Sequence, residues 1–169
     1  MTNDVLPDWD RIVDRHAERV FRVALRILRS VQDAEDVSQD VFIEALRLHK
    51  AGPVQSWTGL LVRLATLRSL DRLRRNRPSL EIREGDRMST VEPLDELEAQ
   101  ELARWLQKAL AQLPDQQATV FAMHYFEQLS REEVSAALGV SLEAVSTTLY
   151  KARQRLLKQL AVFNQGESK

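Results

Sequence analysis

Hydrophobic residues recur at three- and four-residue spacing along most of the chain, and polar residues fill the positions between them. This is the period of an amphipathic helix, so the first half of the chain is predicted to form helices over residues 9–28, 33–49 and 56–75. The break Ala51-Gly52-Pro53 separates the second helix from the third. The inward positions predicted for the second helix are Ala34, Val37, Val41, Ala45 and Leu48.

Residues 129–156 have the pattern of a helix-turn-helix. Ser130 and Glu133 have the spacing of a capping box, which marks the start of a short helix. Gly139 supplies the backbone freedom that a tight turn between two helices needs. Ser141 can cap the second helix of the pair.

The second helix of this pair has one apolar face and one polar, partly basic face. The residues predicted to point inward are Val145, Leu149, Ala152 and Leu156. The residues predicted to lie together on the outer face are Ser146, Thr147, Tyr150, Lys151 and Arg153. A hydrogen-bonding, basic face is what a helix needs to read the major groove of DNA. Considered alone, the segment is also compatible with an ordinary helical pair whose polar face is only solvated.

The charges are arranged in blocks that the net charge of −1 conceals. Six arginines and only one acidic residue, Asp71, lie between positions 63 and 77, and the following segment is acidic. Residues 79–95 also lack helical periodicity, which predicts a flexible acidic linker. The expected fold is therefore all-α, with two small helical domains at residues 1–78 and 96–169, the second containing the helix-turn-helix.

The composition argues against several classes of function. The chain has no cysteine, which removes disulfides, thiolate zinc sites and cysteine nucleophiles. His16, His49 and His124 are scattered, and no glycine-rich phosphate loop is present, so neither catalysis nor a metal or other cofactor is expected. No apolar run approaches the length of a membrane span, and the N-terminal residues lack a signal-peptide pattern. A cytoplasmic chain is expected.

Three segments in this order resemble the extracytoplasmic-function (ECF) sigma factors of bacterial RNA polymerase. They are residues 33–46, residues 57–75 and residues 113–156. These sigma factors contain only the second and fourth sigma domains. The resemblance implies that the first domain binds core polymerase and reads and melts the promoter −10 element, and that the second domain reads the −35 element.

The resemblance also assigns candidate residues and partners. The polymerase-binding residues would be Asp36, Gln39 and Asp40, facing a basic coiled coil of the clamp on the largest polymerase subunit. The residues for the −10 element would be Trp57, Arg63, Arg68, Arg72, Arg74 and Arg75. The five outer-face residues of the last helix would read the −35 element. Further expected partners are the polymerase flap and an anti-sigma factor that holds the chain inactive, and the free chain is expected to be a monomer.

Simpler interpretations of these residues stay open at this point. Asp36 and Asp40 could belong to a solvated acidic face. Trp57 could support the core instead of stacking on a DNA base, and the arginines at the end of its helix could interact only with the helix dipole. A helix-turn-helix repressor is the main competing function, but it explains neither the arginine-rich helix nor the acidic one.

The sequence departs from the family pattern at several positions. Leu60 stands where members usually have an aromatic residue, and Thr66-Leu67 stands where they often have an arginine–asparagine pair. Ser146 and Thr148 occupy positions that are often basic in the family. A less polar −10 helix and a less electrostatic −35 contact are therefore expected.

Overall fold

The computed structural model describes residues 8–76 and 94–166. The first half contains three helices, α1 (Trp9–Leu28), α2 (Val31–Ala51) and α3 (Trp57–Arg75), each within two residues of its prediction. α2 starts two residues early because Ser30 is its N-cap, with its hydroxyl oxygen accepting the backbone N–H of Asp33 at 3.3 Å. Ser56 caps α3 in the same way.

The second half contains α5 (Leu94–Gln112), α6 (Asp115–Phe121), the π-helical turn η1 (Ala122–Phe126), α7 (Arg131–Leu138) and α8 (Leu142–Gly166). The predicted helix-turn-helix is formed by α7 and α8. Ser130 and Glu133 make both hydrogen bonds of the capping box. Gly139 ends α7 in the left-handed conformation with φ of 66°, a region in which a Cβ atom is strained. The structure therefore confirms the predicted all-α fold for the described residues.

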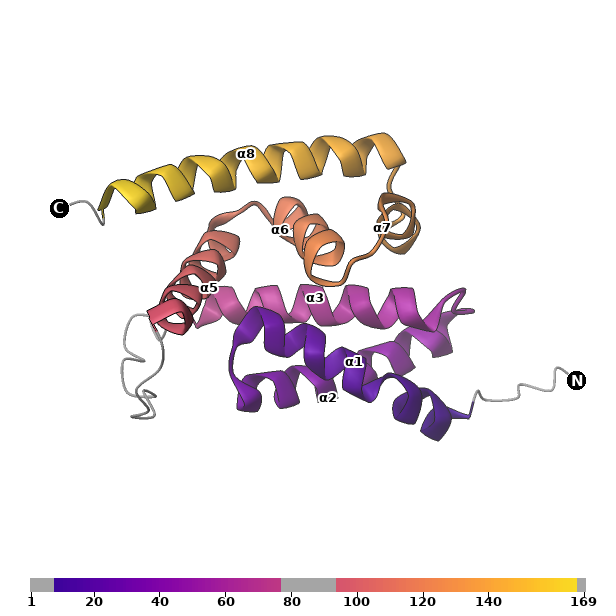
Figure 1. Cartoon of the computed structure of the whole chain (residues 1–169). Coiled ribbons are helices and arrows are strands. Elements are labelled where there is room, and N and C mark those ends of the chain that lie inside the picture. The colour runs from indigo at the N-terminus through magenta and orange to yellow at the C-terminus, as the bar shows by residue number, and fades with distance from the viewer. Residues whose placement is uncertain (1–7, 77–93, 167–169) are drawn as a thin grey trace, which may run out of the picture.

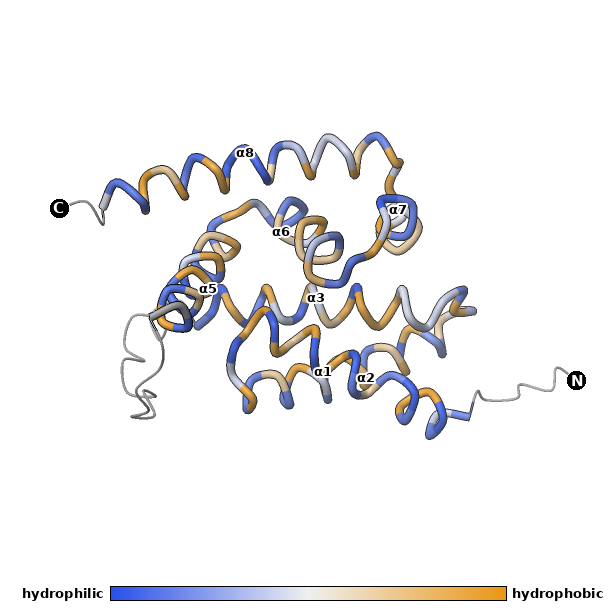
Figure 2. The backbone as a smooth tube through the Cα atoms, in the orientation of Figure 1, coloured by the Kyte–Doolittle hydropathy of each residue, from blue (hydrophilic) through white to orange (hydrophobic). Residues whose placement is uncertain are grey.

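α3 lies between two layers of helices (Figure 1). On one side it packs against α1 and α2, which form the N-terminal unit with it. On the other side it contacts α5, α6, η1 and α7 of the C-terminal unit (α5–α8), and α8 lies outermost across α6 and α7. Figure 2 shows hydrophobic and hydrophilic positions alternating along each helix, as the amphipathic pattern requires.

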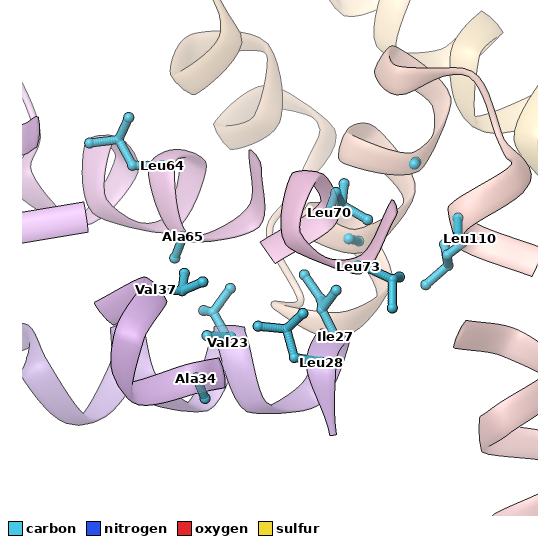
Figure 3. Close-up of a cluster of buried hydrophobic side chains, with 14 of the residues drawn as sticks. Val23, Ile27, Leu28, Ala34, Val37, Leu64, Ala65, Leu70, Leu73 and Leu110 are labelled. Carbon is cyan, nitrogen blue, oxygen red and sulfur yellow. The ribbon is translucent and has the colours of Figure 1, made fainter. Parts of the chain in front are cut away.

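One hydrophobic cluster spans both units. Its side chains from the N-terminal unit include Ile27 and Leu73, and Leu110 of α5 lies beside Leu73 (Figure 3). Burial of apolar surface is the dominant favourable term in packing, so the two units share a core in this conformation. The predicted linker lies outside the described residues for positions 79–93, so the proposed domain boundaries stay a prediction. None of the described helices is both long and apolar enough to cross a membrane.

Candidate partner and nucleic-acid interfaces

The three residues predicted to bind polymerase lie on one exposed face of α2. Asp36, Gln39 and Asp40 all have exposed side chains. Asp40 has no ion pair among residues 8–76 and 94–166, whereas Asp36 lies 3.3 Å from the guanidinium of Arg72. The structure therefore places all three residues together on the surface, and an ion pair joins one of them, Asp36, to α3.

The partner of Asp36 belongs to a network that sequence reasoning missed. Arg72 Nη2 donates to Asp33 Oδ1 at 2.9 Å as well as to Asp36, and Asn76 Nδ2 donates to the other oxygen of Asp33 at 3.3 Å. Asp33 is only 8% exposed, and its hydrogen bond raises the pKa of Arg72 above the ordinary value. In the sequence, Asp33 looked only like a residue in the first turn of a helix.

The other arginines predicted to contact the −10 element also differ in their surroundings. Arg68 Nε donates to Glu44 of α2 at 2.7 Å. Arg74 is 2.9 Å from Asp115 of α6 and donates to the carbonyl of Leu113.

Two of these arginines are free of ion pairs within the described part of the chain. Arg75 is exposed. Arg63 is half-buried and lines a groove of about 670 Å³ between residues 51–56 and α7. The arginines of the predicted basic cluster therefore all lie on α3, but some of them form ion pairs in the folded chain and others do not.

Trp57 lies in an aromatic cluster at the start of α3. Its ring is 5.8 Å from that of Trp9 in an edge-to-face arrangement and 5.5 Å from the imidazole of His49. Trp9 in turn packs edge-to-face on Phe42 at 6.2 Å. Such pairs stabilise the packing of their helices, so the surroundings of Trp57 favour the supporting role.

The face of α3 directed away from α1 and α2 is covered by the C-terminal unit. Val62 is 1% exposed and packs in a second hydrophobic cluster with Val120, Met123 and Val134. A Cβ atom at Gly59 would lie 3.8 Å from the Cβ of Ala137 in α7. The first helix of the helix-turn-helix therefore rests directly on the N-terminal half of α3.

Polar contacts accompany this packing. The side-chain amide of Gln107, which is 7% exposed, donates to the carbonyls of Ile27 and Leu28 at 3.0 and 2.9 Å. These carbonyls end α1 and have no partner within their own helix. Arg26 donates to the carbonyl of Phe126, which ends η1, and pairs with Glu127 at 3.0 Å. Both contacts join the end of α1 to the C-terminal unit.

The polar face of α8 is directed toward solvent, in contrast to the covered face of α3. Val145, Leu149, Ala152 and Leu156 are buried as predicted. Thr147, Tyr150, Lys151 and Arg153 are exposed, and Ser146 is half-buried with its hydroxyl 3.5 Å from Arg131. The structure thus brings all five predicted −35 residues to the outer side of the molecule, and four of them are exposed.

Comparisons with known proteins identify two family regions in the chain. Residues 12–78 match the family model for Sigma-70 region 2, and residues 103–156 match the model for Sigma-70, region 4. The ECF RNA polymerase sigma factor SigM of Mycobacterium tuberculosis is 31% identical over 166 residues, which cover 94% of this chain and 80% of SigM. The chain belongs to the ECF sigma factor family.

Two further matches concern the sequence and the fold. The ECF RNA polymerase sigma factor SigE of Mycolicibacterium smegmatis is 35% identical over 161 residues, but the match spans only 63% of the length of SigE and 92% of this chain. The sigma factor RpoE, solved in complex with the anti-sigma factor NepR from Bartonella quintana, has the same fold with a TM-score of 0.56 at 18% identity. That match covers 93% of this chain and 99% of RpoE.

Proposed function

We propose that this ECF sigma factor binds core RNA polymerase in the cytoplasm and directs promoter-specific transcription initiation. It acts as an initiation factor and not as an enzyme. The observation that carries the proposal is the presence of both sigma regions in one chain, with exposed polar residues on α2 and α8. These two helices lie on opposite sides of α3 (Figure 1). One chain can then contact polymerase through α2 and promoter DNA through α8 at the same time.

Each exposed face suits the role that the resemblance assigns to it. Asp36, Gln39 and Asp40 offer carboxylates and an amide to a basic coiled coil of the clamp, and such complementary charges steer and orient association. In a helix-turn-helix the second helix enters the major groove by its N-terminal part, where Ser146 and Thr147 lie. Lys151 and Arg153 are one to two turns further along and can reach base edges or phosphates.

The closed arrangement of the two units bears on the −10 element. A helix that engages melted DNA needs a surface that a single strand can reach, and the Val62 face of α3 is buried under α6, η1 and α7. We therefore include in the proposal that the C-terminal unit leaves α3 when the chain assembles with core polymerase. The units are joined by two hydrophobic clusters and by the polar contacts of Arg26, Arg74 and Gln107, so their separation must draw on binding energy from the polymerase.

We also infer that a protein inhibitor controls this step. RpoE, which shares the fold, was solved with an anti-sigma factor. A partner that contacts both units at once would stabilise the closed form, since binding shifts a conformational equilibrium by its preference for one state.

Runoff transcription with core polymerase tests the proposed function. Core polymerase plus the chain should transcribe a subset of promoters from a genomic library, while core polymerase alone and the chain alone should not. The Asp40→Arg variant isolates the contact with polymerase. Asp40 is exposed and free of ion pairs in the described chain, so this substitution should affect polymerase binding alone. Tight, specific binding of the free chain to duplex DNA, with no gain from core polymerase, would favour a helix-turn-helix repressor instead.

A further inference from the structure

Four acidic residues lie along one side of α2. Asp33, Asp36, Asp40 and Glu44 recur at spacings of three or four residues, which places them along one side of a helix. Three of the four are paired to α3: Arg72 with Asp33 and Asp36, and Arg68 with Glu44. The pairing order runs in opposite directions along the two helices, as expected for antiparallel neighbours.

Arg72 is held more firmly than a residue of a surface ion pair usually is. The side chain of Asp33 is 11% exposed, that of Arg72 is 35% exposed, and Asn76 donates to the remaining oxygen of Asp33. Removing Arg72 from Asp33 would leave a nearly buried carboxylate without its cation, which is strongly unfavourable. The Nη2 of Arg72 is therefore occupied by Asp33 and Asp36 and is not available to a DNA phosphate while α2 and α3 keep this packing.

We propose that Arg68 and Arg72 are positioning residues of the polymerase-binding helix and that neither contacts promoter DNA. Arg72 fixes the carboxylate of Asp36 on the exposed face of α2, and both arginines set the angle between α2 and α3. Asp40, midway along the same side of α2 and without an ion pair among the described residues, stays free for the polymerase. This inference rests on the proposed function, and it reverses the roles that the resemblance gave to these two arginines.

Arg75 supplies the matched control. It lies in the same last turn of α3 as Arg72, and it is exposed with no ion pair in the described part of the chain. The variants Arg72→Gln and Arg75→Gln remove the same charge from neighbouring positions. Affinity for core polymerase and the salt dependence of promoter binding by the assembled holoenzyme are measured for both.

The two variants should show opposite effects. Arg72→Gln should weaken binding to core polymerase by roughly tenfold, the size expected for one misplaced interfacial charge, and leave the salt slope unchanged. Arg75→Gln should leave polymerase affinity unchanged and reduce the salt slope by about one unit, as one lost phosphate contact does. A reduced salt slope for Arg72→Gln with normal polymerase affinity would overturn the proposal.

Two further variants separate positioning from a general loss of stability. If Arg72 acts through Asp36, then Arg72→Gln combined with Asp36→Asn should bind polymerase no worse than Asp36→Asn alone, whereas additive losses would contradict the mechanism. Exchanging the charges of the second pair, with Arg68→Glu and Glu44→Arg together, should restore the open-complex formation that either single change reduces. A double variant as defective as Arg68→Glu alone would show that Arg68 contacts DNA. Failure of the wild-type chain to bind core polymerase would instead remove the proposed function itself.

Discussion

The two helices proposed to contact promoter DNA differ in how much of their surface is buried. α8 has four buried residues among 25, all on one stripe, and its polar face is open to solvent. α3 has eight buried residues among 19, because α1 and α2 cover one side and the C-terminal unit covers the other. The polar face of α8, the proposed −35 helix, is thus already accessible, whereas α3, the proposed −10 helix, lies at the centre of the molecule.

This difference separates effects on folding from effects on recognition. A substitution on the outer face of α8 removes no packing, so it should act on DNA binding alone. A substitution on the Val62 face of α3 acts first on the contact between the two units. Substitutions in α3, in α5 and on the outer face of α8 can alter or measure this difference.

The largest effect is expected from Val62→Asp. A carboxylate at this position would have no partner among Val120, Met123 and Val134, and an uncompensated buried charge costs roughly 3–5 kcal/mol. The closed form should lose that amount, so the units should separate and the radius of gyration measured by small-angle X-ray scattering should rise. Val162→Asp, at an α8 side that is 70% exposed, is the control and should change nothing. An unchanged radius for Val62→Asp, with helical content retained, would argue against the packing of α3 under the C-terminal unit.

A smaller effect is expected from Gln107→Ala. The change leaves the carbonyls of Ile27 and Leu28 without their donor and should reduce stability by about 1–3 kcal/mol, the cost of unsatisfied buried acceptors. Urea unfolding of this variant is compared with that of Lys108→Ala, an exposed neighbour on the same helix. Equal midpoints for the two variants would contradict a role for Gln107 in joining the units.

The smallest effect on stability is expected from Lys151→Ala and Arg153→Ala. Both side chains are exposed, so unfolding should change by no more than about 0.5 kcal/mol. Transcription from a library of −35 sequences should nevertheless respond: Lys151→Ala should relax preference at one or two positions, whereas Arg153→Ala should lower activity at all sequences. Parental base preferences in both variants would mean that this face of α8 does not read the −35 element.

Local features of this fold could be predicted from the sequence because they depend on neighbouring residues. Ser130, Glu133 and Gly139 lie within ten residues of one another, and their spacing alone specified the cap and the turn. The buried stripe of α8 followed from its helical period in the same way. These features include the whole predicted −35 face.

The contacts that join distant segments could not be predicted in this way. Arg72 lies 39 residues from Asp33, and Gln107 lies 80 residues from Ile27, so nothing local marks them as partners. The prediction that Leu48 points inward was wrong: it is 43% exposed, because it lies in the last turn of α2, beside the groove near residues 51–56. The second buried side of α3 includes Thr66 and Ser69, whose polar character concealed it.

One engineered disulfide can test directly whether the C-terminal unit must leave α3 before the promoter opens. The chain has no cysteine, and a Cβ atom added at Gly59 would lie 3.8 Å from the Cβ of Ala137, close to the mean of about 3.8 Å in natural disulfides. The variant carrying Gly59→Cys and Ala137→Cys is assembled with core polymerase in its oxidised and reduced forms, and permanganate reactivity of the −10 region reports promoter opening. The oxidised form should fail to open the promoter and the reduced form should open it as the wild type does. Equal opening by both forms would show that α3 works without being uncovered and would contradict the account.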